Sequence, residues 1–166
     1  MHVIDVDTAH EDGITFRFAA RDDVAAIVAL LADDVLGKTR EAAGDQELDR
    51  YLQAFGDMAA QGGNQYLLAI NESGDIVGCV QITIIPGLSR SGNKRAQLEG
   101  VRVASSARGL NIGTRMINEA HAIAANEGCG LVQLTTDRQR DDALRFYEEL
   151  GYQNSHNGMK LSLDER

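Results

Sequence analysis

The segment best suited to chemistry is the run VRVASSARGLNIGTRM, residues 101–116. It reads as the end of a strand, a turn of small and polar residues, and the start of a helix. N–H groups in the first turn of a helix have no partner inside the helix, and the helix dipole adds roughly half a positive charge there. Gly109 and Gly113 keep bulky side chains away from these donors. The run therefore predicts a cradle for an anion such as a pyrophosphate.

Other chemical motifs are excluded or disfavoured. The run has neither the Gly-Lys-Ser/Thr of a P-loop nor GxGxxG, which argues against ATP hydrolysis and a nicotinamide dinucleotide site. An ordinary helix start behind a flexible turn remains the alternative. Cys79 and Cys129 form no metal-ligand set and no disulfide framework, so the sequence predicts no metal site. No cationic residue beside Cys129 in the sequence would lower its thiol pKa, and Cys79 lies in an apolar strand, so a cysteine nucleophile is disfavoured.

Composition sets the class of protein. The 166 residues are 43% hydrophobic and carry a net charge of −9, which predicts one soluble globular domain over 1–166, with 1–12 mobile. No apolar run approaches the roughly 20 residues that span a bilayer, and the acidic start does not resemble a signal peptide, so we expect a cytoplasmic protein without membrane contact. The acidic balance also argues against nucleic-acid binding.

The charge is unevenly distributed along the chain. Residues 1–60 carry a net charge of −8, residues 61–118 of +3 and residues 119–166 of −4. An anionic ligand is least repelled by the middle third, and a cationic partner is drawn to the first third. Solubility alone is the competing explanation for the acidic first third.

Hydrophobic periodicity predicts alternating strands and helices. Strands are expected at 13–20, 64–70, 76–85, 95–103 and 131–136, with one or two more in 152–163. Helices are expected after Asp22-Asp23, after Asp45, from 112 to a stop at Gly128, and over 141–150, and 86–95 is expected to be a polar loop. This pattern predicts an α/β (α+β) fold with helices packed on a mixed, largely antiparallel sheet.

Two separated segments, LEGVRVASSARGLNIGTRMI and DALRFYEELGY, resemble the GNAT-type N-acetyltransferase superfamily. Its signature is Arg or Gln, two residues, Gly, one residue, then Gly or Ala, which here runs from Arg108 to Gly113. The chain departs from it at Asn111, where the family usually has glycine, but Asn tolerates a left-handed backbone best among the other residues. The resemblance implies a sheet of six to seven strands with about four helices, splayed between the fourth and fifth strands.

The resemblance also implies acetyl-coenzyme A as cosubstrate. Backbone groups of Val101 and Val103 would bind the pantetheine arm in the manner of an added strand. Arg102 is a nearby cation, with a salt bridge to the acidic helices as its alternative role. Relatives often place Asn three residues before a conserved Ala, whereas this chain has Arg140 before Ala143, which would still donate to the coenzyme. The residues implied to hold the pyrophosphate are Arg108, Gly109, Leu110, Asn111, Ile112, Gly113 and Thr114.

The chemistry needs an acid, a base and an oxyanion donor. Tyr147 is the expected acid, because a phenol can protonate a coenzyme A thiolate and the matching tyrosine has this role in relatives; a core aromatic is its alternative. Glu99 is the expected base, acting through water on the attacking amine, with a structural ion pair to Arg95 or Lys94 as its alternative. A backbone N–H near Val101 would hold the oxyanion. Direct transfer in a ternary complex is favoured over an acetyl-cysteine route.

The acceptor is expected to be a primary amine of a small cationic molecule or a peptide, since the first third is acidic. The competing hypothesis is a non-catalytic acetyl-coenzyme A sensor that acts on a protein partner and needs the cradle but neither acid nor base. Apolar edge strands in the tail are compatible with a homodimer.

Overall fold

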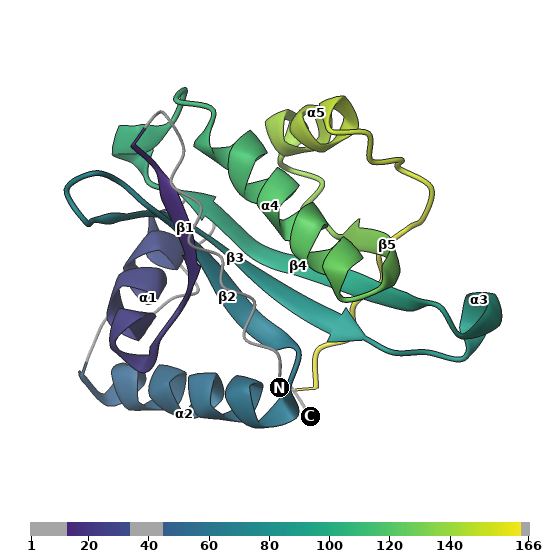
Figure 1. Cartoon of the computed structure of the whole chain (residues 1–166), viewed down its shortest axis with the longest axis horizontal. Coiled ribbons are helices and arrows are strands. Elements are labelled where there is room, and N and C mark those ends of the chain that lie inside the picture. Colours follow the sequence, from purple (N-terminus) through teal and green to yellow (C-terminus); the bar gives the residue numbers. More distant parts are fainter. Residues whose placement is uncertain (1–12, 34–44, 164–166) are drawn as a thin grey trace. The chain divides into compact units, whose positions relative to one another are not determined.

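The computed structural model describes residues 13–33 and 45–163 (Figure 1). The chain forms two compact units, residues 1–133 and 134–166. The single-domain organisation stays a prediction. Residues 1–12, for which the sequence predicted mobility, lie outside the described residues. Within the described part of the chain, no helix combines the length and the apolar character needed to cross a bilayer.

A five-stranded sheet in the order β1-β2-β3-β4-β5 dominates the first unit. Its strands are β1 (Thr15–Phe18), β2 (Asn64–Ile70), β3 (Ile76–Ile85), β4 (Lys94–Val103) and β5 (Cys129–Leu134). The first four pair antiparallel with their neighbours.

The strands β4 and β5 advance in the same direction. The Gly130 N–H donates to Oδ1 of Asn93 at 3.1 Å, and Nε2 of Gln133 donates to Oε1 of Gln97 at 2.8 Å. Residue numbers on both strands rise together between these two contacts, as they do in a parallel pair. The sheet is therefore mixed and largely antiparallel, as the sequence predicted.

Helices pack on both faces of the sheet. The longer ones are α1 (Val24–Ala32), α2 (Asp45–Gln61) and α4 (Ile112–Asn126). A Cβ built on Gly78 would lie 3.4 Å from the sulfur of Met116 in α4, whereas Cys79 clusters with Ile27 and Leu30 of α1. Because neighbouring residues of a strand face opposite sides, α4 covers one face and α1 the other.

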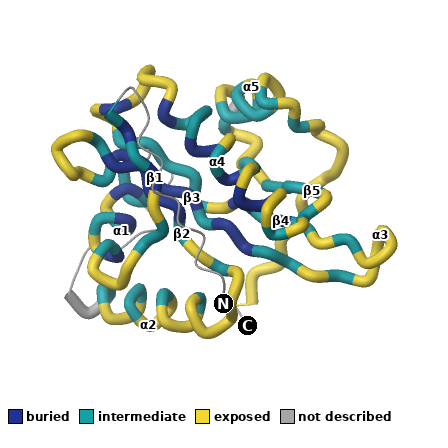
Figure 2. The backbone as a smooth tube through the Cα atoms, in the orientation of Figure 1, coloured by how far each residue is buried: buried dark blue, intermediate teal, exposed yellow. Residues whose placement is uncertain are grey.

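The apolar core lies along the middle strands, where the tube in Figure 2 shows buried backbone. Residues of β2, β3 and β4 fill it together with the inward face of α4 that the sequence spacing predicted. Its largest fully buried side chains are Phe16, Leu67, Leu68, Leu98, Ile112, Met116, Ile117, Val80 and Cys79. Gly128 has φ +76° just after α4, which confirms it as the stop of that helix.

The second unit contains α5 (Asp141–Glu149) and an extended tail. The tail corrects the predicted strand number: the described residues form five strands rather than six to seven, because no residue of 152–163 is in a strand. Met159, Leu161 and Leu163 keep the alternation of a strand but are 94%, 73% and 70% exposed. Alternation creates a strand only where a neighbour accepts its hydrogen bonds.

Two smaller predictions also need correction. The expected polar loop 86–95 contains α3 (Ser89–Gly92), a single turn in which Arg90 and Ser91 are left-handed. The fifth strand occupies Cys129–Leu134 rather than 131–136, because it begins directly after the left-handed Gly128.

Candidate functional site

The turn before α4 has a left-handed backbone, which the sequence indicated that Asn111 tolerates. Asn111 has φ 58° and ψ 13°, and Gly109 has φ +82°. The Arg115 N–H donates to the Asn111 carbonyl at 3.2 Å. The N–H groups of 112–114 precede this bond, in the first turn, where the helix supplies no acceptor for them. The donors required for an anion cradle are thus present at the start of α4.

The Arg108 side chain braces this turn against the end of α1. Its Nε donates to the Val103 carbonyl at 3.4 Å and its Nη2 to the Asp33 carbonyl at 3.2 Å. The Asp33 carboxylate in turn accepts from the Ser105 N–H at 2.9 Å. The guanidinium is held by main-chain carbonyls, so a positive charge is fixed beside the cradle.

A β-bulge interrupts β4 a few residues before the cradle. Glu99 is opposite Gln81, and Arg102 is opposite Cys79. Two residues of β4, Gly100 and Val101, therefore face the single β3 residue Val80. Gly100 has φ +59°, which is the left-handed conformation of a glycine bulge. A bulge leaves part of the ladder unpaired and redirects the strand, so it presents main-chain donors where a regular strand would not.

Val101 and Val103 flank Arg102 on the far side of the bulge. The Val101 carbonyl accepts from Nη1 of Arg102 at 2.7 Å, and the Val103 carbonyl accepts from Arg108. Each carbonyl has a second lone pair for another donor. Arg102 is opposite Cys79 and therefore lies on the α1 face, away from α4. This position favours its structural role over a contact with phosphate.

Glu99 is exposed and lies on the α1 face, opposite Gln81. The ion pair considered as its alternative is not formed with any residue that the structure describes. Lys94 instead donates to the Glu127 carbonyl at 2.9 Å, and the Arg95 guanidinium lies beside Gly87. The carboxylate of Glu99 is thus open to solvent one residue before the bulge.

Tyr147 lies in the second unit, on α5. Its ring makes edge contacts with Phe146 and Tyr152, at centroid distances of 5.1 and 5.6 Å. Burial raises the pKa of Tyr152 above its usual value, and the neighbouring Tyr147 raises it further. Arg140 is the N-cap of α5, and its carbonyl accepts from the Ala143 N–H at 3.1 Å. The helix start thus fixes the main chain of both predicted coenzyme contacts in this unit.

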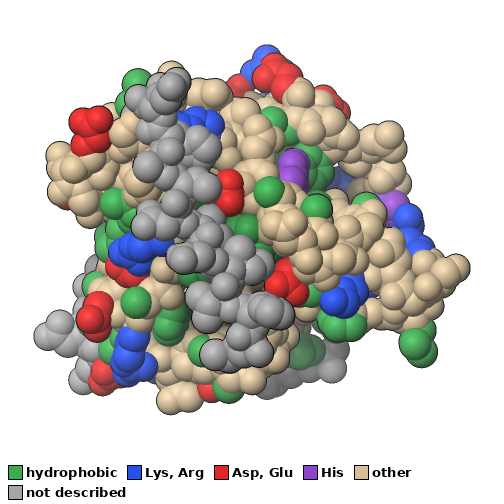
Figure 3. All heavy atoms as spheres, viewed as in Figure 1, with side chains coloured by type: hydrophobic (Ala, Val, Ile, Leu, Met, Phe, Trp, Pro, Cys, Tyr) green, Lys and Arg blue, Asp and Glu red, His purple; other side chains and the backbone are tan. Residues whose placement is uncertain are grey.

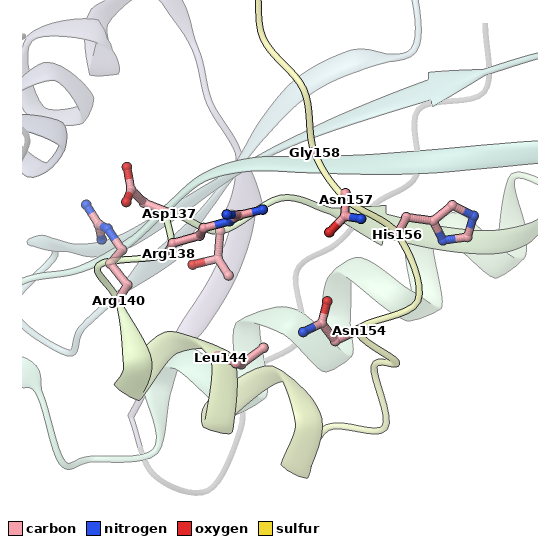
Figure 4. A pocket seen from close by; sticks show the side chains of 9 residues that line it. Asp137, Arg138, Arg140, Leu144, Asn154, His156, Asn157 and Gly158 are labelled. Carbon is pink, nitrogen blue, oxygen red and sulfur yellow. The ribbon is translucent and has the colours of Figure 1, made fainter.

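The second unit also encloses a cavity of about 330 Å³, which Figure 4 shows from close by. The Arg138 side chain extends toward the side where Asn157 lies, and Arg140 points the other way. The cavity is bordered by Thr136, Asp137, Arg138, Arg140, Leu144, Asn154, His156, Asn157 and Gly158.

Both cysteines are unsuited to nucleophilic attack. Burial raises the pKa of Cys79 to about 12, although Arg102 opposes this effect. Burial also raises the pKa of Cys129, and Lys94 only partly offsets it. Cations therefore lie near both thiols, which corrects the expectation drawn from the sequence for Cys129, but desolvation outweighs them. Both thiols stay protonated near neutral pH.

Comparison with known proteins decides the family. The model of the Acetyltransferase (GNAT) family matches residues 15–152, which include the cradle, the bulge and α5. The chain belongs to the GNAT acetyltransferase family. The predicted resemblance and the GNAT fold are therefore confirmed, with five strands in place of six to seven. Members of this family use acetyl-coenzyme A as acetyl donor.

Three relatives show how far the GNAT likeness extends. The crystal structure of a transcriptional regulator from Bacillus halodurans C-125 has a TM-score of 0.86, with 43% identity over 90% of this chain and 99% of that one. The aminoalkylphosphonate N-acetyltransferase of Salmonella typhimurium is 29% identical over 84% of this chain and 85% of its own length. The uncharacterized protein YdhI of Bacillus subtilis is 29% identical, but the match spans only 51% of this chain and 48% of that protein.

Several residues near the predicted site residues were missed by sequence reasoning. The bulge at Gly100 had a signal, because a glycine inside a strand often marks a bulge. The polar residues Gln81, Gln97 and Gln133 had none, since only the register places them on one face. Tyr152, the ring partner of Tyr147, is the last residue of the segment DALRFYEELGY, but sequence reasoning assigned it no role. No group of three His, Cys, Asp or Glu residues suited to a metal occurs in 13–33 and 45–163.

Proposed function

We propose that the chain transfers the acetyl group of acetyl-coenzyme A to a primary amine by direct attack in a ternary complex. The main support is the start of α4, where a left-handed turn at Asn111 leads into first-turn N–H groups with no helical acceptor. Main-chain donors of this kind suit the pyrophosphate of the coenzyme, and Arg108 adds a fixed positive charge beside them.

The base and the oxyanion donor are assigned to β4, beside and within its bulge, and the acid is assigned to α5. Glu99 takes a proton from the ammonium through water, and the neutral amine attacks the thioester carbonyl. A main-chain N–H of the bulge at Val101 stabilises the resulting oxyanion. When the tetrahedral intermediate collapses, the carbon–sulfur bond breaks and Tyr147 donates its proton to the departing thiolate. The nitrogen loses its second proton to water, and Tyr147 regains a proton from water. One ammonium and one thioester thus give one amide, one free thiol and one proton, which Glu99 passes to solvent.

Calorimetry and thiol release test this proposal together. Acetyl-coenzyme A is titrated into the protein, and release of free thiol is then followed with a broad panel of primary amines. We expect one site for each chain and thiol release that depends on both the amine and the protein. Absence of binding, or binding elsewhere than the α4 turn in a crystal, would contradict the proposal.

A second candidate function is an acetyl-coenzyme A sensor that acts on a protein partner. Its support is the 43% identity to a protein described as a transcriptional regulator. A sensor needs the cradle but no acid or base, so it would bind acetyl-coenzyme A and release no thiol with any amine. The same panel therefore separates the two functions.

A pair of substitutions at Asn111 tests the cradle itself. Asn111→Gly keeps the left-handed turn, so we expect acetyl-coenzyme A affinity within about threefold of the native chain. A β-branched residue is strained at φ 58°, and Asn111→Val should lower stability by roughly 1–2 kcal/mol and affinity by roughly tenfold or more. Calorimetric affinity and urea unfolding measure these effects, and equal affinities for the two variants would remove the turn from the site.

A further inference from the structure

The α1 face of the sheet changes from apolar to polar along the strands. Near α1 it carries Leu68 opposite Cys79, in a cluster with Ile27 and Leu30. Two rows of polar side chains follow on the same face. One row is Asn64, Thr83 and Gln97, each opposite the next, and the adjacent row contains Gln81 opposite Glu99.

Hydrogen bonds join these side chains into two groups on the same face of the sheet. Oδ1 of Asn64 accepts from Nε2 of Gln81 at 2.9 Å and from Oγ1 of Thr83 at 3.2 Å. In the second group, Nε2 of Gln133 on β5 donates to Oε1 of Gln97 on β4 at 2.8 Å. We call this set the amide floor; it consists of Asn64, Gln81, Thr83, Gln97 and Gln133.

Neither core packing nor ordinary solvent exposure explains the amide floor. The opposite face of the same strands is apolar and buried, with Leu67, Val80 and Leu98 at 1% exposure or less. A surface face of a sheet usually carries long charged side chains, but these residues are uncharged and half-buried or, for Thr83, buried. Amides ordered by one another at partial depth are prepared to meet a polar ligand.

The unused hydrogen-bonding groups define the ligand. An amide side chain offers two donors and two acceptor lone pairs. The hydrogen bonds among the described residues, including one from Nε2 of Gln97 to the Leu98 carbonyl, use only part of this capacity at Gln81, Gln97 and Gln133. Such groups match hydroxyls or amides. A bare hydrocarbon leaves them unsatisfied, and a phosphonate meets no cation among them. Glu99, beside Gln81, is the adjacent carboxylate for an ammonium.

We propose that the amide floor binds the uncharged, hydroxyl- or amide-bearing body of the acceptor, with its primary amine at Glu99. This proposal rests on the acetyltransferase function proposed above. It selects hydroxylated or amide-bearing amines over polyamines, plain alkylamines and aminoalkylphosphonates. The bulge follows Glu99 directly, so an acceptor lying on the floor brings its amine to the reacting end of β4.

Matched amines test the selectivity. D-glucosamine is compared with cyclohexylamine, and serinol with isopropylamine, while spermidine and 2-aminoethylphosphonate represent charged bodies. We expect at least one hydroxylated amine to have a kcat/KM tenfold or more above its bare partner and above both charged amines. The highest kcat/KM with a bare or charged amine would overturn the amide floor as the acceptor site and leave the acetyltransferase function standing. Acetyl-coenzyme A binding without thiol release from any amine would overturn both.

Substitutions locate that selectivity on the floor. Gln97→Leu and Gln81→Leu should each lower kcat/KM for the preferred hydroxylated amine about tenfold, mainly through KM, and change its bare partner less than twofold. Gln53→Leu, on the exposed surface of α2, is the matched control and should change neither. Melting curves establish that the variants fold. An equal loss for both members of a pair in the folded variants would contradict the proposal.

Discussion

Replacing Tyr147 by phenylalanine is expected to lower turnover by roughly ten- to a thousandfold while acetyl-coenzyme A affinity stays within about twofold. The substitution removes one hydroxyl and keeps the ring, so the contacts with Phe146 and Tyr152 at 5.1 and 5.6 Å are retained. Only a step that needs a proton should suffer, and that step is departure of the thiolate. Steady-state thiol release and calorimetry measure the two quantities.

Tyr152→Phe is the matched control for Tyr147. It removes the neighbouring phenol, whose pKa burial raises, so its proton is the harder one to give up. We expect it to keep turnover within a fewfold. If both substitutions lower turnover equally, the aromatic pair has a packing role and the acid is another group. If neither does, solvent protonates the thiolate.

The sequence predicted those parts of the fold that local chemistry determines. The hairpin of β2 and β3, the start of α2 at Asp45 and the stop of α4 at Gly128 follow from period, turn residues and glycine. The tail was the main failure, because the alternation of Met159, Leu161 and Leu163 indicates a strand whether or not a partner strand exists.

The candidate site likewise contains parts that the sequence indicates and parts that it does not. The left-handed turn at Asn111 is a local property of a short polar loop, and the sequence indicated that Asn111 tolerates it. The amide floor depends on register across four strands, where a slip of one residue moves every side chain to the other face. Gln97 and Gln133 are 36 residues apart, and no local pattern indicates that they are hydrogen-bonded.

The exposed charges say less about the acceptor than the net charge of the first third suggested. On the face drawn in Figure 3, acidic and basic side chains of the described residues form small separate groups. Some of the acidic side chains form ion pairs. Arg17 pairs with Asp23 at 2.6 Å and lowers the pKa of the Asp23 carboxyl. Part of the acidic first third is therefore used in structure, and the nature of the acceptor is better argued from the residues beside Glu99.

Substitution of Gly100 is expected to have the other large effect. Alanine at φ +59° costs about 1–2 kcal/mol, and its Cβ would lie 3.0 Å from the Tyr66 hydroxyl. If the bulge survives, the free energy of unfolding falls by at least that strain. If β4 instead becomes regular, Arg102 is forced toward the α4 face and the oxyanion donor at Val101 is lost. We therefore expect Gly100→Ala to lower turnover roughly a hundredfold, with a reduced urea midpoint.

Gly74→Ala separates strain from catalysis. Gly74 has φ +85° in the turn between β2 and β3, and no neighbouring atom lies within 4 Å of an added Cβ. Gly74→Ala therefore has a similar cost in backbone strain to Gly100→Ala, but it does not alter β4. Turnover measured well below both urea midpoints should fall only for Gly100→Ala. If both variants lose stability but both keep native turnover, the bulge serves only the packing of β4. The oxyanion donor must then be another group of the site.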